Sequence, residues 1–168
     1  MMFEGPWLAE RYSAVGAFIA AHADQVDSAV RQVILDSSRY TAAEAFEAIH
    51  RLNGLRRIIQ GVFDSAEALA VPTVGTVYRI DEVLADPIAT NATNGHCLNY
   101  ANIADLAAVA VPNGFLASGV PMGMTLLAPA FSDAMLVDLA GEFHARRSPI
   151  MGATGIPLPG SDERKSCA

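Results

Sequence analysis

Residues 106–128 read LAAVAVPNGFLASGVPMGMTLLA and carry the clearest strand pattern of the chain. Two apolar runs, Leu106–Phe115 and Met122–Ala128, flank a connection of turn-forming residues at Leu116–Pro121. Apolar runs separated by glycine and proline are typical of paired strands. We therefore expect a β-hairpin at or near the centre of a sheet.

Helical patterns lie on both sides of this hairpin. Thr41 and Glu44 have the spacing of a capping box, and the apolar stripe that follows, Phe46–Phe63, predicts a long helix. A last helix is expected to begin at Ser132–Asp133 and to end in cationic residues. The remaining expectations are a helix from about Pro6 to Ala23, a short helix through Val26–Ile34, a loop at Ser37–Tyr40, a buried strand over Ala68–Val71, a long ordered connection over Thr73–Asn94 and a buried side chain at Asn102.

Composition restricts the partners that the chain would have. The 168 residues fit one domain, and with 52% hydrophobic and only 17% charged residues another surface is expected to cover part of it. The net charge of -7 argues against nucleic acid. No apolar run is long enough to cross a membrane, and Cys97 and Cys167 do not form a disulfide framework, so we expect a cytoplasmic chain with reduced thiols.

Metal ligands do not cluster in the sequence. Three acids, Asp81, Glu82 and Asp86, lie close together, but their spacing matches no calcium loop and lacks the bidentate glutamate that such loops need. The four histidines are scattered along the chain. We therefore expect neither a metal nor another cofactor.

The N-terminal stretch 3–12, FEGPWLAERY, places one arginine in the first helix. The guanidinium of Arg11 presents planar, paired donors that suit a bidentate carboxylate. An ion pair with a nearby acid such as Glu10, on a solvated face, is the alternative, and surface ion pairs are the commoner case. The residues alone favour that alternative.

Four runs together resemble the second half of the amidase domain of allophanate hydrolases, members of the amidase-signature family. They are FEGPWLAERY (3–12), VPTVGTVYRIDEVLADPIATN (71–91), NYANIADLAAVAVPNGF (99–115) and GVPMGMTLLAPAFSDAML (119–136). The resemblance extends from about Phe3 to Pro159. It implies an α/β fold with a mixed sheet flanked by helices, in which residues 1–160 form the C-terminal half of an amidase-signature domain. Residues 161–168, SDERKSCA, are expected to be a disordered tail.

The resemblance also implies a substrate site. In that family the arginine matching Arg11 binds the substrate carboxylate, and an aromatic residue eight positions earlier, usually tyrosine, lines the same pocket. Phe3 occupies that position, so the tyrosine hydroxyl is missing. The implied substrate is allophanate or a similar carboxylate-bearing amide.

The family's catalytic residues have no counterpart in this chain. They are two serines in a glycine- and serine-rich loop and a lysine base, which activate the nucleophile and present donors to the oxyanion. The only lysine is Lys165, and the only serine pair, Ser37–Ser38, has no flanking glycines. We therefore predict no catalytic residue in the chain and no hydrolysis of allophanate to ammonia and carbon dioxide by the chain alone.

Three functions remain open from the sequence. The first is a fragment of allophanate hydrolase that supplies the carboxylate-binding part. The second is a fragment of another amidase or of an A-type amidotransferase chain. The third is a non-catalytic partner chain of a split amidase, which would need the missing N-terminal half; because the family often forms dimers, a homodimer is left open as well.

Overall fold

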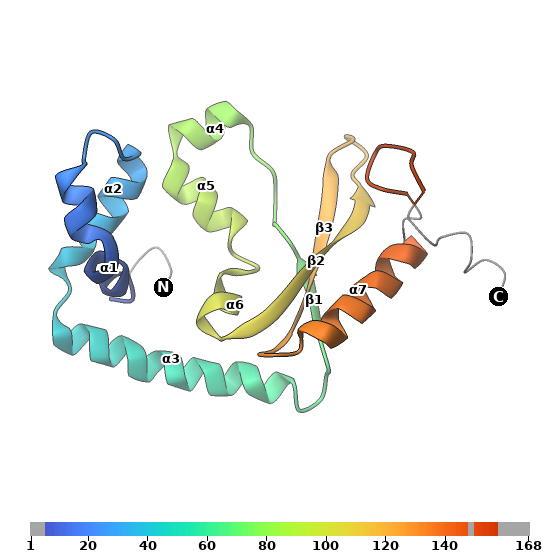
Figure 1. The fold of residues 1–168 in the computed structure, drawn as a ribbon, viewed down its shortest axis with the longest axis horizontal. Coiled ribbons are helices and arrows are strands. Elements are labelled where there is room, and N and C mark those ends of the chain that lie inside the picture. Colours follow the sequence, from blue (N-terminus) through green and yellow to red (C-terminus); the bar gives the residue numbers. More distant parts are fainter. Residues whose placement is uncertain (1–5, 148–149, 158–168) are drawn as a thin grey trace.

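The computed structural model describes residues 6–147 and 150–157. Its elements in chain order are α1 (Leu8–Ala21), α2 (Ser28–Leu35), a 3₁₀ helix (Asp36–Arg39), α3 (Ala42–Val62), β1 (Leu69–Pro72), α4 (Ile80–Ala85), α5 (Pro87–Asn94), α6 (Asn99–Ile103), β2 (Leu106–Phe115), β3 (Pro121–Pro129) and α7 (Asp133–Arg147). Helices α1 and α2 form one end of the molecule, the sheet with α7 forms the other, and α3 runs between them (Figure 1). The α/β class is thus confirmed.

The sheet has the order β1-β3-β2, and both strand pairs are antiparallel. The predicted hairpin is confirmed as β2–β3, with β3 in the centre. Its tight connection is closed by hydrogen bonds from Gly119 N to Leu116 O (2.9 Å) and from Leu116 N to Val120 O (2.8 Å). Gly119 has φ +83°, a conformation that residues with a Cβ rarely adopt, which explains glycine at this turn.

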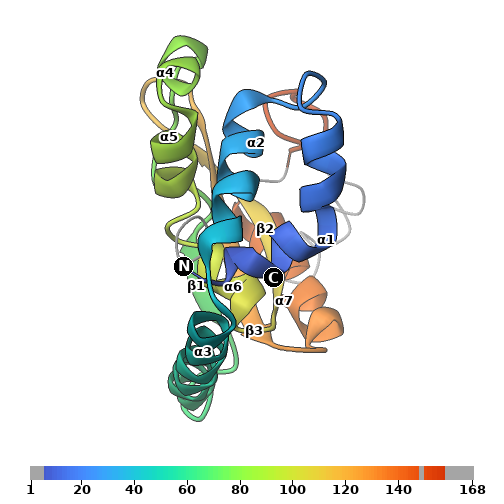
Figure 2. The same ribbon diagram turned by 90° about the vertical axis from the view of Figure 1, so that its left-hand side faces the viewer.

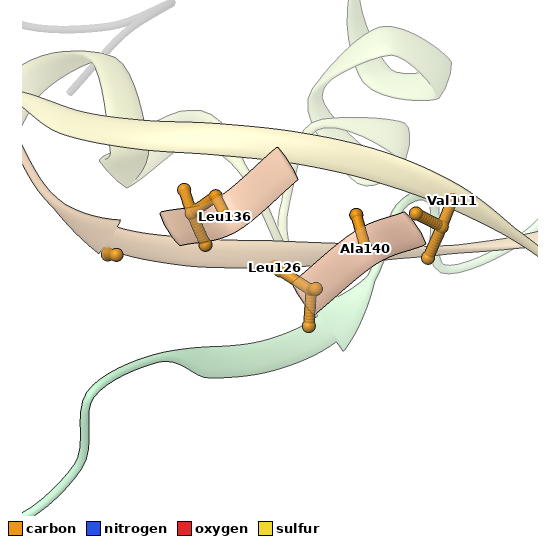
Figure 3. Close-up of a cluster of buried hydrophobic side chains, with 5 residues drawn as sticks. Val111, Leu126, Leu136 and Ala140 are labelled. Atoms are coloured by element: carbon orange, nitrogen blue, oxygen red, sulfur yellow. The ribbon is translucent and has the colours of Figure 1, made fainter. Parts of the chain in front are cut away.

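The core lies between this sheet and α7. Val111 of β2, Leu126 and Ala128 of β3, and Leu136 and Ala140 of α7 form one buried cluster (Figure 3). The alternation of side chains along each strand points every second residue toward the helix, and Leu136 and Ala140 are one helical turn apart. The C-terminal third of the chain therefore has a compact core of its own.

Helix α3 begins with the predicted capping box. Thr41 Oγ1 accepts from Glu44 N (3.3 Å), and the Glu44 carboxylate accepts from Thr41 N (2.8 Å). Only Ala48 and Leu52 of its apolar stripe are buried, whereas Phe46 is 64% and Ile58 is 70% exposed. The helix forms as predicted, but most of its apolar residues have no cover within the described part of the chain.

Residues 73–94 differ from the expected long connection, because they contain α4 and α5. The Asp86 carboxylate accepts from Ala89 N (3.0 Å), and proline occupies the first position of α5. A capping aspartate followed by proline is a strong helix start, since proline's missing N–H costs nothing there. This short D-P signal determines the local structure although the surrounding apolar pattern is weak.

Three further expectations are corrected. Residues 36–39 form a 3₁₀ helix where a loop was expected, and Ser37 is buried in it with its hydroxyl donating to Val33 O (2.7 Å). Asn102 is exposed, because α6 turns its neighbours Ala101 and Ala104 inward in its place. Strand β1 is only half-buried, since it lies at an edge of the sheet.

Candidate functional site

Arg11 lies in the first turns of α1 and is half-buried. It lines a groove of about 400 Å³ between α1 and α2 on one side and α4 and α5 on the other. Figure 2 shows α2 between α5 and α1, and in Figure 1 α5 is again beside α2. Arg11 therefore lines a concave surface of the molecule, and its role in binding stays a prediction.

The wall of this groove is mostly apolar. Helix α2 contributes Ala29, Val30, Val33 and Ile34, and the α4–α5 segment contributes Val83, Pro87 and Ile88. Three polar side chains complete the lining: Arg11, Asp27 and Asn91. A ligand in the groove would thus meet one cation, one acid and one amide among aliphatic groups.

Local sequence signals explain where Asp27 and Asn91 lie. Asp27 precedes α2, and its carboxylate caps the helix by accepting from Ala29 N (2.9 Å) and Val30 N (3.2 Å). Asn91 lies on α5, whose start is fixed by the Asp86 cap. The carboxylate of Asp27 is held by backbone donors, so it has a defined place at the rim of the groove.

Glu10, the alternative partner for Arg11, lines a different cavity. That cavity, of about 490 Å³, lies between the start of α1 and α3 and includes Trp7, Ile49 and Arg56. Arg56 also ties α3 to α6, with Nε donating to Ile103 O (2.6 Å). Glu10 and Arg11, which are neighbours on α1, thus line two different cavities.

Phe3 lies outside the described residues, so the second predicted site residue has no structural account. Asp27, Asn91 and the aliphatic wall were missed at the sequence level. The D-P pair at 86–87, which marks the start of α5, was the one local signal for Asn91. Helices α2 and α5 lie on opposite sides of the groove, although they are about sixty residues apart in the sequence. No local sequence signal predicts that arrangement.

Titratable groups with perturbed pKa values lie away from this groove. Burial raises the pKa of Tyr100, with a further contribution from Cys97. The hydrogen bonds that Glu44 accepts from the backbone and side chain of Thr41 lower the pKa of that carboxyl.

No group of three metal-ligating side chains is present among residues 6–147 and 150–157. Over the same ranges, none of the helices is both long and apolar enough to cross a bilayer.

Comparison with known proteins identifies the family of this chain. The sequence profile described as Amidase matches residues 18–137, which is most of the chain. The chain belongs to the amidase family. Among curated relatives, this amidase chain is 34% identical over 144 residues to the urea amidolyase of Lachancea kluyveri and 33% identical over 150 residues to that of Saccharomyces cerevisiae. These alignments cover 84% and 88% of the chain but only 8% of each relative.

Solved structures extend the likeness to three dimensions. The allophanate hydrolase of Kluyveromyces lactis superposes with a TM-score of 0.86 at 33% identity over 96% of this amidase chain, which covers 28% of that protein. The A-type chain of the Thermotoga maritima glutamyl-tRNA(Gln) amidotransferase has a TM-score of 0.61 at 23% identity, a likeness of fold alone. The resemblance to allophanate hydrolases that the sequence indicated is thus confirmed over nearly the whole chain.

Proposed function

We propose that this chain supplies the carboxylate-binding part of an amidase of the allophanate hydrolase type. The observation that carries the proposal is the position of Arg11 in a groove between two helical segments. The match to the Kluyveromyces lactis allophanate hydrolase over 96% of the chain supports it. In the proposed role, the Arg11 guanidinium binds the substrate carboxylate through a charge-assisted, bidentate pair.

Hydrolysis would need residues that come from elsewhere. The chain has one lysine, Lys165, and no glycine- and serine-rich loop around its serine pair. An acyl-transfer site requires an activated nucleophile and oxyanion donors. We therefore assign no catalytic residue to this chain and infer that a second polypeptide segment, the N-terminal part of an amidase domain, completes the active site.

The exposed apolar residues support the inference that a second segment packs against this chain. Besides α3, helix α4 has Ile80 80% and Leu84 75% exposed, and Phe18 of α1 is 61% exposed. Exposed apolar patches mark interaction sites more often than free surface. A partner that packs over these helices would both bury them and bring a nucleophile toward the groove.

The test is ammonia release from allophanate by this chain mixed with a separately expressed N-terminal amidase part. We expect activity in the mixture and none from the chain alone. Arg11→Lys should then raise KM by about ten- to a hundredfold, because one charge-assisted interaction contributes about 1.5–3 kcal/mol. Arg51→Lys, on the exposed side of α3, is the matched control and should leave KM unchanged. An unchanged KM for Arg11→Lys would refute the role of Arg11.

A second candidate is a part of an A-type amidotransferase chain. The corresponding chain of the Moorella thermoacetica glutamyl-tRNA(Gln) amidotransferase is 33% identical over 122 residues and aligns with 69% of this chain. That function predicts glutamine hydrolysis in the completed enzyme. Selectivity for amides that carry a free carboxylate next to the scissile group would favour the first candidate.

A further inference from the structure

Phe131 is the most exposed large apolar side chain among residues 6–147 and 150–157. It lies in the connection between β3 and α7, and 98% of it is exposed. A phenylalanine ring contributes a large free energy when it is removed from water. Within the described part of the chain, Phe131 makes almost none of that contribution.

The backbone of Phe131 is also in an unfavourable conformation. Its φ is +67°, and in the described ranges Asp105 is the only other residue besides glycine with a positive φ. Aspartate tolerates this conformation because its short polar side chain can hydrogen-bond locally, whereas a bulky aromatic residue does not. Ser132 N donates to Pro129 O (3.2 Å) and closes the turn. Phe131 is the third residue of that turn, where glycine or asparagine usually supplies a positive φ.

Both properties are unfavourable for the chain by itself. Glycine at position 131 would relax the backbone and remove the exposed ring. Strained backbone conformations cluster at functional sites, where the strain accompanies a required side-chain position. The closed turn holds the backbone of the ring in one place, so little conformational freedom is lost when the ring is bound. An exposed aromatic side chain on a fixed turn is typical of an interface anchor.

The ring lies near the surface on which a second segment is proposed to pack. Pro129, two residues before Phe131, pairs with Leu106 at the start of β2. Helix α6 precedes β2, and its Ile103 O accepts a hydrogen bond from Arg56 Nε of α3 (2.6 Å). Both ribbon views place the β3–α7 turn at the same end of the sheet as α3 (Figures 1 and 2). A single partner surface would therefore reach both Phe131 and the exposed apolar residues of α3.

A second copy of the chain fits this ring less well than a different partner does. Two copies that met at the β3–α7 turn would place one exposed turn against another and leave both rings without a pocket. The grooves described above lie among helices α1–α5. A copy that inserted Phe131 into one of them would bind head to tail, which generates rings or filaments and not a two-fold dimer.

We propose that Phe131 anchors this chain to the N-terminal amidase part by inserting its ring into an apolar pocket of that part. This inference rests on the proposed function, because the partner is the segment that completes the active site. The pocket is lined by aliphatic or aromatic side chains and is the size of one phenyl ring. Phe131 does not line the groove at Arg11, so it acts on assembly and not on substrate binding.

The test separates assembly from substrate binding. The full 168-residue chain is titrated with the N-terminal amidase part, and ammonia release from allophanate gives the concentration of that part at half-maximal activity. Phe131→Ala should raise this concentration about ten- to a hundredfold, the factor for one buried phenyl ring, and leave KM at saturation unchanged. Arg11→Lys should do the reverse, with a raised KM and an unchanged half-maximal concentration.

Phe115→Ala is the matched control. Phe115 is 51% exposed and lies at the other end of the β2–β3 hairpin, opposite Pro121, so its loss should leave the half-maximal concentration unchanged. Phe131→Gly tests the strained turn. Because glycine accepts a φ of +67°, urea unfolding of the chain alone should have a higher midpoint for Phe131→Gly than for Phe131→Ala. Both variants should lose partner binding equally.

Sedimentation of the mixture measures binding without catalysis and separates the outcomes. If the original chain binds the N-terminal part and Phe131→Ala binds it equally well, the anchor is refuted and the proposed function stands. If the original chain does not bind that part, both fail. Self-association of the chain that Phe131→Ala abolishes would assign the ring to a contact between copies and refute the inference. Equal urea midpoints for the alanine and glycine variants would refute the strained turn on which it rests.

Discussion

Leu136→Ala should remove the side chain that fixes α7 to the sheet. Leu136 is 1% exposed and belongs to the cluster with Val111, Leu126 and Ala140. The change removes three carbons, which corresponds to about 2.4 kcal/mol of lost transfer free energy. A rigid cavity would add to this, but α7 covers only one face of a small sheet and the site can partly collapse. We expect the free energy of unfolding to fall by about 2.5–3 kcal/mol.

Leu139→Ala is the matched control on the same helix. Leu139 is 41% exposed, so the identical change in chemistry and helix propensity should cost about 1–1.5 kcal/mol. Urea unfolding followed by far-UV circular dichroism measures both costs, with the midpoints compared at a common slope. Equal costs for the two variants would refute the packing of α7 that places Leu136 inward.

Three further predictions concern elements outside the groove. The pKa of the Glu44 carboxyl is lowered in the folded chain by its hydrogen bonds with Thr41. The stability that these bonds contribute should therefore be present above the unfolded pKa and be lost as the pH falls through the folded pKa. Glu44→Gln should abolish this part of the acid dependence of α3 helicity, measured by circular dichroism. Gly123→Ala should destabilise the sheet because the added Cβ would lie 2.7 Å from a side-chain oxygen, whereas Gly141→Ala meets no atom within 4 Å and should stabilise α7 by about 0.5–1 kcal/mol in thermal unfolding. Burial raises the pKa of Tyr100, so its phenol should ionise above the ordinary value in an ultraviolet titration, and Tyr100→Phe should remove that late step.

The sequence predicted the fold correctly where its signals were local. The turn at 116–121 predicted the hairpin, and the spacing of Thr41 and Glu44 predicted the start of α3, because turns and caps depend on a few neighbouring residues. The helices within 73–94 were missed because the D-P start of α5 is followed by a segment with few apolar residues. Burial at Asn102 was wrong because the orientation of a one-turn helix depends on its neighbours in space.

The candidate site was only partly accessible from sequence. Arg11 was found because its residue type and the family resemblance both singled it out. Asp27 and Asn91 were not found, since they line one groove only because α2 and α5 lie on opposite sides of it, an arrangement that periodicity does not encode. The role of Phe3 stays a prediction, since that residue lies outside the described part of the chain.

Helix α3 sets the spacing between the two ends of this molecule. Its 21 residues span about 31 Å, and each residue rotates the helix by about 100°. Deleting a single residue near its middle would therefore turn the α1–α2 end by more than a quarter of a circle relative to the sheet, although every residue of the groove would be retained. Adding seven residues, close to two full turns, would keep the original facing and lengthen the separation by about 10 Å. Length changes in this helix should thus be tolerated only in multiples that preserve its phase.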